Sequence, residues 1–279
     1  MPLEKLGNIL RSADKKNTAA IGFNCMSNES IDAIITAGES LGIPVIAMLY
    51  PDMQNLISVE TFAAVTKTIA EKAGIPVGLH LDHCQSLETI KTAMEAGFTS
   101  VMIDGSRLPY KENLEITKKV VEMAKKTGVH VEAELGLVGT ASNKEDFKDS
   151  SLYTDPGQAA EFAQKTGVDA LAIAIGNAHG FYIEEPVLDL EVLSAINSAT
   201  ETPLVLHGGS GISDDQLRES FRRGINKLNV GTEYFAAFHS AIKSYAAQAG
   251  GKDDYFTFLE YQKTKVNEYL KNKLLLTKV

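Results

Sequence analysis

Short apolar runs of strand length recur along this 279-residue chain and alternate with segments of helical periodicity. Several runs follow a glycine or proline that can end a helix, as in LGIPV, AGIPV and TGVDA. This alternation is typical of parallel βαβ units. The runs lie near residues 19–24, 44–50, 76–82, 100–104, 130–135, 170–175, 203–207 and 227–230. Eight such units predict an α/β fold of the (β/α)8 barrel type, which usually needs about 250 residues.

The main structural alternative is an open, doubly wound sheet. That fold would favour a GxGxxG turn after an early strand, and the sequence has none. Two further helical segments, 234–248 and 255–274, are expected to close the barrel and to add one helix beyond it. No repeat or linker divides the sequence, so residues 1–279 are predicted to form a single barrel domain.

The composition narrows the expected partners and location. The formal charge is -9 and the basic residues are scattered, so nucleic acid is not an expected partner. No apolar stretch reaches the roughly 20 residues of a membrane span, and the amphipathic first segment does not resemble a signal peptide. Because Cys25 and Cys84 are too few for a disulfide framework, the sequence predicts a cytoplasmic protein.

Three histidines lie where expected strands end. His83 ends the third strand in LHLDHC, His179 follows the sixth in AIGNAHG, and His207 ends the seventh in LVLHGGSG. In this fold the chemistry lies at the carboxyl ends of the strands. Three neutral imidazoles would leave a further coordination position open for a substrate, as in a catalytic zinc site.

A histidine met alone is more often a hydrogen-bonded core residue than a metal ligand. His80 lies inside the third strand, and we interpret it as a packed residue or one that supports the ligands. His130 begins a strand and His239 lies on a helix, and both are interpreted as structural. Because three histidines lie together at the reactive strand ends, metal binding becomes the favoured interpretation for these three.

Carboxylates accompany the predicted metal site. Asp82 directly precedes His83 at the end of an apolar strand, where it could transfer a proton. Glu132 and Glu134 alternate along the fifth strand and so face the same side, where a buried pair needs a counter-charge. Two interpretations are equally favoured for Glu132, contact with a metal ion and hydrogen bonding to neighbouring strands.

A glycine-rich turn, HGGSGIS, follows the seventh strand and can present backbone N–H groups to an anion, with Ser213 capping the next helix. The eighth strand ends in the segment NVGT. Loops after strands seven and eight are the usual phosphate site of this fold. A metal that polarises a carbonyl, a phosphate site and an acid together fit aldol cleavage of a ketose 1-phosphate.

Seven segments, LHLDHC, SVMIDGSRLP, VEAELGLVG, LYTDP, AIGNAHG, LHGGSGI and KLNVGTE, occur in this order over about 160 residues. In this order they resemble the metal-dependent class II fructose- and tagatose-bisphosphate aldolases. The resemblance implies that His83, His179 and His207 bind Zn²⁺ and that Asp82 moves the proton of the C4 hydroxyl. It also implies Glu134 as an alternative ligand.

The same resemblance implies the residues that hold the dihydroxyacetone phosphate half of the substrate. Asn24 would contact its hydroxyls. A monovalent cation near the phosphate and assembly into a homodimer or homotetramer are further expectations. The residues implied around the phosphate are Gly180, Gly208, Gly209, Ser210, Asn229, Val230, Gly231 and Thr232.

The chain departs from the family pattern around the other half of the substrate. It has NVGT where the fructose-bisphosphate enzymes have NVDT, and MLYPD lacks their small hydroxyl residue. Phe235 replaces a common basic residue, and Lys263 stands where an arginine is expected. A single flexible lysine is a poor substitute for bidentate arginine. The sequence therefore predicts poor use of fructose 1,6-bisphosphate and preference for a ketose 1-phosphate whose far end is neutral or carries a group such as a sulfonate or carboxylate. A tagatose bisphosphate is the next candidate.

The loop after the fifth strand, GLVGTASNKED, lacks the double glycine of the family, and Glu145 is the candidate for the catalytic glutamate of that loop. Two other functions stay open. One is a metal-dependent sugar-phosphate isomerase or epimerase on the same barrel, and the other is a non-catalytic aldolase subunit. The ordered motifs favour the aldolase, and the intact Asp82 and histidines argue against a non-catalytic role.

Overall fold

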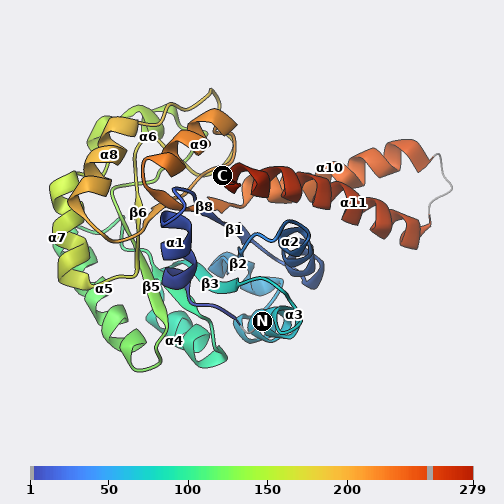
Figure 1. Ribbon diagram of the computed structural model, residues 1–279, viewed down its shortest axis with the longest axis horizontal. Helices are drawn as coiled ribbons and strands as arrows, with labels where there is room; N and C mark the ends of the chain where they lie inside the picture. The colour runs from blue at the N-terminus through green and yellow to red at the C-terminus, as the bar shows by residue number, and fades with distance from the viewer. Residues whose placement is uncertain (1–2, 250–253, 279) are drawn as a thin grey trace.

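Eight parallel strands form a closed barrel in the computed structural model, which describes residues 3–249 and 254–278 (Figure 1). Each strand pairs with its neighbour in sequence, and β8 returns to β1 through pairs such as Ala20 with Lys227. The predicted (β/α)8 barrel is thereby confirmed. The strands are β1 (Ala20–Asn24), β2 (Val45–Leu49), β3 (Val77–Cys84), β4 (Ser100–Ile103), β5 (His130–Leu135), β6 (Ala170–Ile173), β7 (Leu204–Leu206) and β8 (Ile225–Val230).

Helices surround the barrel, and most follow directly after a strand (Figure 1). Glycines in the left-handed conformation end α2, α4 and α7, as the stop signals predicted. The helices are α1 (Leu6–Asp14), α2 (Asn28–Leu41), α3 (Val59–Ala70), α4 (Leu87–Ala96), α5 (Tyr110–Lys125), α6 (Lys144–Lys148), α7 (Pro156–Thr166), α8 (Leu190–Ala199), α9 (Asp214–Arg222), α10 (Thr232–Ala249) and α11 (Tyr255–Leu274), with 3-10 turns η1 (Pro51–Asn55), η2 (Ser150–Leu152) and η3 (Leu275–Thr277).

The first helix closes one end of the barrel. Leu6 and Leu10 of α1 are fully buried and cluster with inward-facing residues that include Ala20 and Ala170. Since Ala20 and Ala170 begin β1 and β6, α1 covers the amino-terminal ends of the strands. The carboxyl-terminal ends are therefore the open end of the barrel, where this fold carries its chemistry.

The last two long helices form an antiparallel pair that projects from the barrel (Figure 1). The helix α10 begins two residues before the predicted segment, and α11 has the predicted bounds. Val266 and Leu270 of α11 are buried, and the helix also packs on α2. Within the described ranges, we find no helix of the length and apolarity that crossing a membrane requires.

Candidate metal and substrate site

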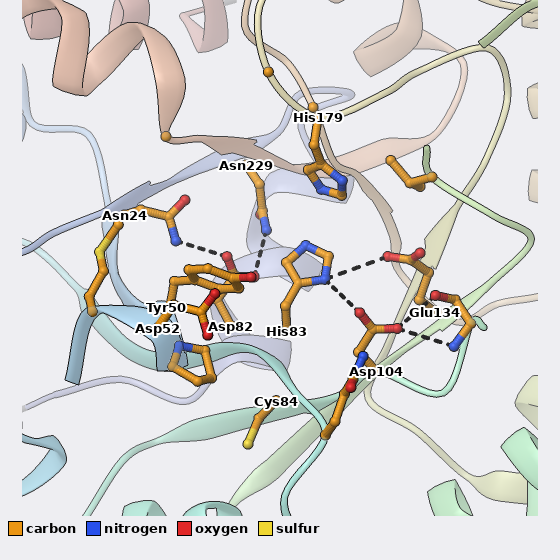
Figure 2. Close-up of a pocket in the computed structure, with 18 of the residues that line it drawn as sticks. Asn24, Tyr50, Asp52, Asp82, His83, Cys84, Asp104, Glu134, His179 and Asn229 are labelled. Carbon is orange, nitrogen blue, oxygen red and sulfur yellow. Dashed lines mark hydrogen bonds and ion pairs between the residues drawn. The ribbon is translucent and has the colours of Figure 1, made fainter. Parts of the chain in front are cut away.

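A pocket of about 870 Å³ opens at the carboxyl-terminal ends of the strands (Figure 2). Most of the residues predicted from the sequence to bind metal or substrate line it. Those residues are Asn24, Asp82, His83, Glu134, His179, Gly180, Gly208, Ser210, Asn229, Gly231 and Thr232.

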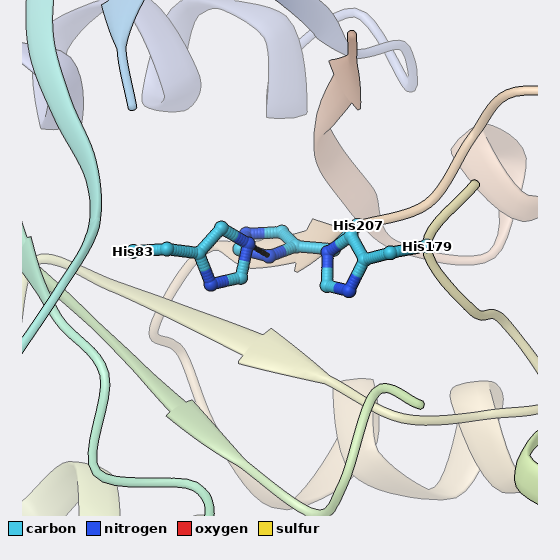
Figure 3. A group of neighbouring side chains, drawn as sticks. All are labelled: His83, His179 and His207. Carbon is cyan, nitrogen blue, oxygen red and sulfur yellow. Dashed lines mark hydrogen bonds between the residues drawn. The ribbon is translucent and has the colours of Figure 1, made fainter. Parts of the chain in front are cut away.

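The three predicted metal ligands converge beside this pocket (Figure 3). One ring nitrogen from each of His83, His179 and His207 lies within 4.8 Å of the others. The Nδ1 atom of His207 lies 2.8 Å from Nε2 of His83. The Nε2 atom of His179 is buried and has no hydrogen-bond partner among the described residues. A divalent cation between the rings would satisfy this nitrogen, so the three residues fit a metal site.

The charges around the histidines also suit a cation. Burial disfavours the charged form of His207, but contacts with Glu132 and Glu134 raise its pKa to about 10. Burial and the neighbouring His83 and His207 lower the pKa of His179 to about 3, so that ring is neutral. The carboxylates thus stabilise positive charge at one ring, and another ring keeps the lone pairs that a metal needs.

A second group of possible ligands, His83, Asp104 and Glu134, overlaps the first. Asp104 lies 3.1 Å from Nδ1 of His83 and accepts a 2.7 Å hydrogen bond from the Ser106 hydroxyl. Sequence reasoning missed Asp104. Its position in the sequence could have indicated it, because Asp104 directly follows β4, just as Asp82 and His83 lie at the end of β3. The remaining nitrogen of His83, Nε2, faces the other histidines.

The backbone of His83 is in the left-handed region, with φ of 44°. The register between β3 and β4 shifts between Leu81 and Cys84, so this part of the strand is irregular. A positive φ is uncommon outside glycine and costs free energy, and such residues concentrate at functional sites. The irregular end of β3 brings both Asp82 and His83 into the pocket lining.

The Asp82 carboxylate is buried and held by two amides (Figure 2). Asn24 donates to one of its oxygens at 2.8 Å, and Asn229 donates to the other at 3.0 Å. Burial opposes ionisation, but the positive charges of His83, His207 and Lys227 hold the pKa of Asp82 below its usual value. The carboxylate is therefore ionised at neutral pH and can accept a proton.

Glu132 belongs to a network inside the barrel. Its two carboxylate oxygens lie 2.7 Å from Nζ of Lys227 and 2.9 Å from Nε2 of His207. The structure thus favours hydrogen bonding over direct metal contact for Glu132, and its counter-charge is the fully buried Lys227. As predicted, His80 is packed, with Nδ1 2.8 Å from the Ser100 hydroxyl.

Replacing Lys227 by methionine should strongly destabilise the protein. The change leaves the fully buried Glu132 carboxylate without its cation, and breaking a buried pair costs about 3–5 kcal/mol. Urea denaturation of metal-free protein measures this loss. Lys263→Met, which removes an exposed ion pair with Asp32, is the matched control and should change stability far less. Equal effects of the two substitutions would contradict this account of the buried pair.

The turn after β7 lies on the other side of the pocket. Gly208 has φ of 65°, and a Cβ there would fall 2.0 Å from the Ala178 carbonyl oxygen, so only glycine fits. The Tyr182 hydroxyl accepts from the Ala178 N–H and donates to the Gly208 carbonyl, which ties the loop carrying His179 to this turn. Ser213 is the N-cap residue of α9 as expected, but its hydroxyl makes no capping hydrogen bond and instead accepts from the Gln216 side chain.

Five predicted residues do not line the pocket, and one of them is His207, which is fully buried beside the other two histidines. Gly209 and Val230 are buried beside residues that do. Glu145 is exposed on α6, and its backbone N–H is held by Asn143. Lys263 on α11 lies 3.4 Å from Asp32 and outside the lining. The expected role of Lys263 at the far end of the substrate is therefore not supported, because α11 projects from the barrel with this lysine directed to α2.

Comparison with known proteins identifies the family. The model of class II fructose-bisphosphate aldolases matches residues 4–278. This chain belongs to that family. It is also 41% identical over 231 residues to the protein YdjI of Escherichia coli K12, a match that covers 83% of each chain. As a member of the family the chain is a class II aldolase, a carbon–carbon lyase.

Solved structures agree with this assignment. The crystal structure of the YdjI aldolase superposes with a TM-score of 0.89 at 35% identity, covering 100% of this chain and 98% of that one. A structure described as a putative fructose-1,6-bisphosphate aldolase from Coccidioides immitis gives a TM-score of 0.85 at 28% identity, covering 98% and 95%. The fructose-bisphosphate aldolase of Campylobacter jejuni, at 22% identity, has the same fold with a TM-score of 0.85 over 98% of this chain and 94% of that one.

Proposed function

We propose that this aldolase is zinc-dependent and reversibly cleaves a ketose 1-phosphate to dihydroxyacetone phosphate and an aldehyde. One observation carries the proposal. Three imidazoles converge beside the buried carboxylate of Asp82, and a glycine-lined turn faces them across one pocket. A metal site, a proton-transfer group and an anion site thus share one space.

His83, His179 and His207 would hold the zinc ion. Asp104 contacts the other ring nitrogen of His83, and Glu132 contacts that of His207. Such outer contacts fix the orientation of an imidazole ligand. When bound, the ion supplies Lewis-acid polarisation of the substrate carbonyl and charge stabilisation during cleavage.

The phosphate would bind at the loops after β7 and β8. Gly208, Ser210 and Gly231 line this side of the pocket. Thr232 begins α10, so the partial positive charge of an 18-residue helix is available there for an anion. Glycines allow a phosphate to approach the backbone N–H groups closely.

Asp82 would take the proton of the substrate's C4 hydroxyl during cleavage. The C3–C4 bond then breaks, the C4 oxygen becomes the carbonyl of the aldehyde, and the electron pair remains with the C3 side. C3 then takes up a proton, ultimately from solvent, to give dihydroxyacetone phosphate. In the reverse reaction Asp82 returns the proton. Asn24 and Asn229 hold the carboxylate for this step.

The test is a panel of ketose 1-phosphates and ketose bisphosphates, with release of dihydroxyacetone phosphate measured by a coupled assay. Exchange of the C3 proton of dihydroxyacetone phosphate with solvent is measured in parallel, because it needs no aldehyde. We expect exchange and cleavage of at least one member. Ketose isomerisation or epimerisation without either activity would favour the alternative reaction class.

A further inference from the structure

Arg107, in the loop between β4 and α5, is exposed and lines the pocket. Among the described residues that line the pocket it is the one lysine or arginine. The lining otherwise includes four carboxylates, at Asp52, Asp82, Asp104 and Glu134. Carboxylates near an arginine would ordinarily pair with it, so an unpaired arginine in a pocket with four carboxylates is unusual.

Arg107 has no hydrogen bond or ion pair within the part of the chain that the structure describes, and the other arginines all have one. Arg11 donates to Asn8, and Arg218 donates to backbone carbonyls near residue 275. Arg222 and Arg223 pair with Glu219. The five donors of Arg107 are therefore available to a ligand.

The position of Arg107 is opposite the proposed phosphate site. The closed strand order places β4 four strands from β8, which is half of the ring. The glycine-lined turns follow β7 and β8, and the three histidines come from β3, from the loop after β6 and from the end of β7. A ketose whose phosphate lies at β7 and β8 would extend past the histidines toward the loops of β2, β3 and β4.

The loops on that side carry other free polar groups. The Gln54 and Gln85 side chains line the pocket and make no hydrogen bond within the described ranges. The Ser106 hydroxyl, next to Arg107, is fixed on Asp104. A sugar chain reaching Arg107 would thus pass donors and acceptors suited to hydroxyl groups.

We propose that Arg107 binds a single negative charge, such as a carboxylate, at the far end of the substrate and so selects the aldehyde that is released. This inference rests on the proposed function, because it assigns the part of the ketose 1-phosphate beyond C4. A guanidinium matches a carboxylate through two parallel hydrogen bonds. One arginine among four carboxylates neutralises one charge well and a phosphate dianion poorly.

The test compares three forms of one four-carbon aldehyde in condensation with dihydroxyacetone phosphate: erythrose, erythrose 4-phosphate and erythruronate, which ends in a carboxylate. The ratio of kcat/KM for the carboxylate form to that for the neutral form measures selectivity. Wild-type enzyme should prefer the carboxylate form. Arg107→Met should lower the ratio about 10- to 100-fold, the loss expected for hydrogen bonds to a charged group, mainly through KM. Arg107→Lys should retain part of it.

Two control variants accompany the test. Arg222→Met removes an exposed arginine outside the pocket and should leave the ratio unchanged. Lys263→Met tests the residue suggested by the sequence and should also leave it unchanged. An unchanged ratio in Arg107→Met would overturn the inference, as would loss of selectivity in Lys263→Met or a wild-type preference for the phosphate form. Wild-type enzyme that exchanges the C3 proton of dihydroxyacetone phosphate but uses none or all three aldehydes equally would also overturn it. Absence of that exchange would instead count against the proposed function.

Discussion

Removal of metal should abolish aldol cleavage, and added zinc should restore it. The three histidine nitrogens lie within 4.8 Å of one another, and the buried Nε2 of His179 has no other partner in the described structure. Removal of the ion takes away the Lewis acid that would polarise the substrate carbonyl. Because Lewis-acid stabilisation of the transition state amounts to several kcal/mol, activity should fall by at least about 10³-fold.

His207→Ala tests the same site from the side of the protein. The substitution removes one of three ligands and also leaves Glu132 without its contact to Nε2. The purified variant should contain little zinc by elemental analysis, because the remaining site is incomplete. His239→Ala is the control, since His239 lies on α10 and is exposed. Full activity of metal-free enzyme, or a borohydride-trapped imine on a lysine, would refute a metal-dependent mechanism.

Much of the barrel was predictable because strand signals are local. Alternating apolar runs and glycine stop signals lie within a few residues of each other, and all eight predicted strands occur. The eighth begins at Ile225 and not at 227. Asn226 and Lys227 are buried and paired across the molecule, to Asp14 and Glu132. The strand itself and Lys227 were predicted, but the polar Asn226 obscured where the strand begins, and its contact with Asp14 is a tertiary one.

The site was predictable only where a strand end determines position. Asp82, His83 and His207 follow from their places along the strands. Contacts between strands do not follow in this way. Asp104 could have been noted from its place after β4, but its contact with His83, like that of Lys227 with Glu132, has no sequence signal of its own. Arg107 was missed for the same reason, because a loop position says little about which pocket its side chain enters. Lys263 is the opposite case. The family pattern implied a role for it in the pocket, but the pattern does not determine where a residue on a projecting helix lies.

Asp82→Asn should lower aldol cleavage by about 10²-fold or more, the usual effect of deleting a positioned general acid-base group. The carboxylate accepts from both Asn24 and Asn229, whereas an amide offers one oxygen and one NH₂ group. The new side chain keeps the shape, but it cannot take the C4 proton, and its NH₂ group meets one of the two amide donors.

The variant should keep its zinc, because Asp82 is outside the three converging histidines. The decisive comparison is between cleavage and the exchange of the C3 proton of dihydroxyacetone phosphate. Exchange involves no C4 hydroxyl, so it should fall much less than cleavage does. Asp82→Ala removes the proton acceptor without introducing an NH₂ group. It therefore separates the loss of proton transfer from the clash of amide groups. If the two variants lose cleavage equally while exchange persists, the missing proton acceptor is the cause. Near-normal cleavage in Asp82→Asn would assign the C4 proton to another residue, and an equal fall in exchange and cleavage would mean that Asp82 supports the site as a whole rather than the C4 step.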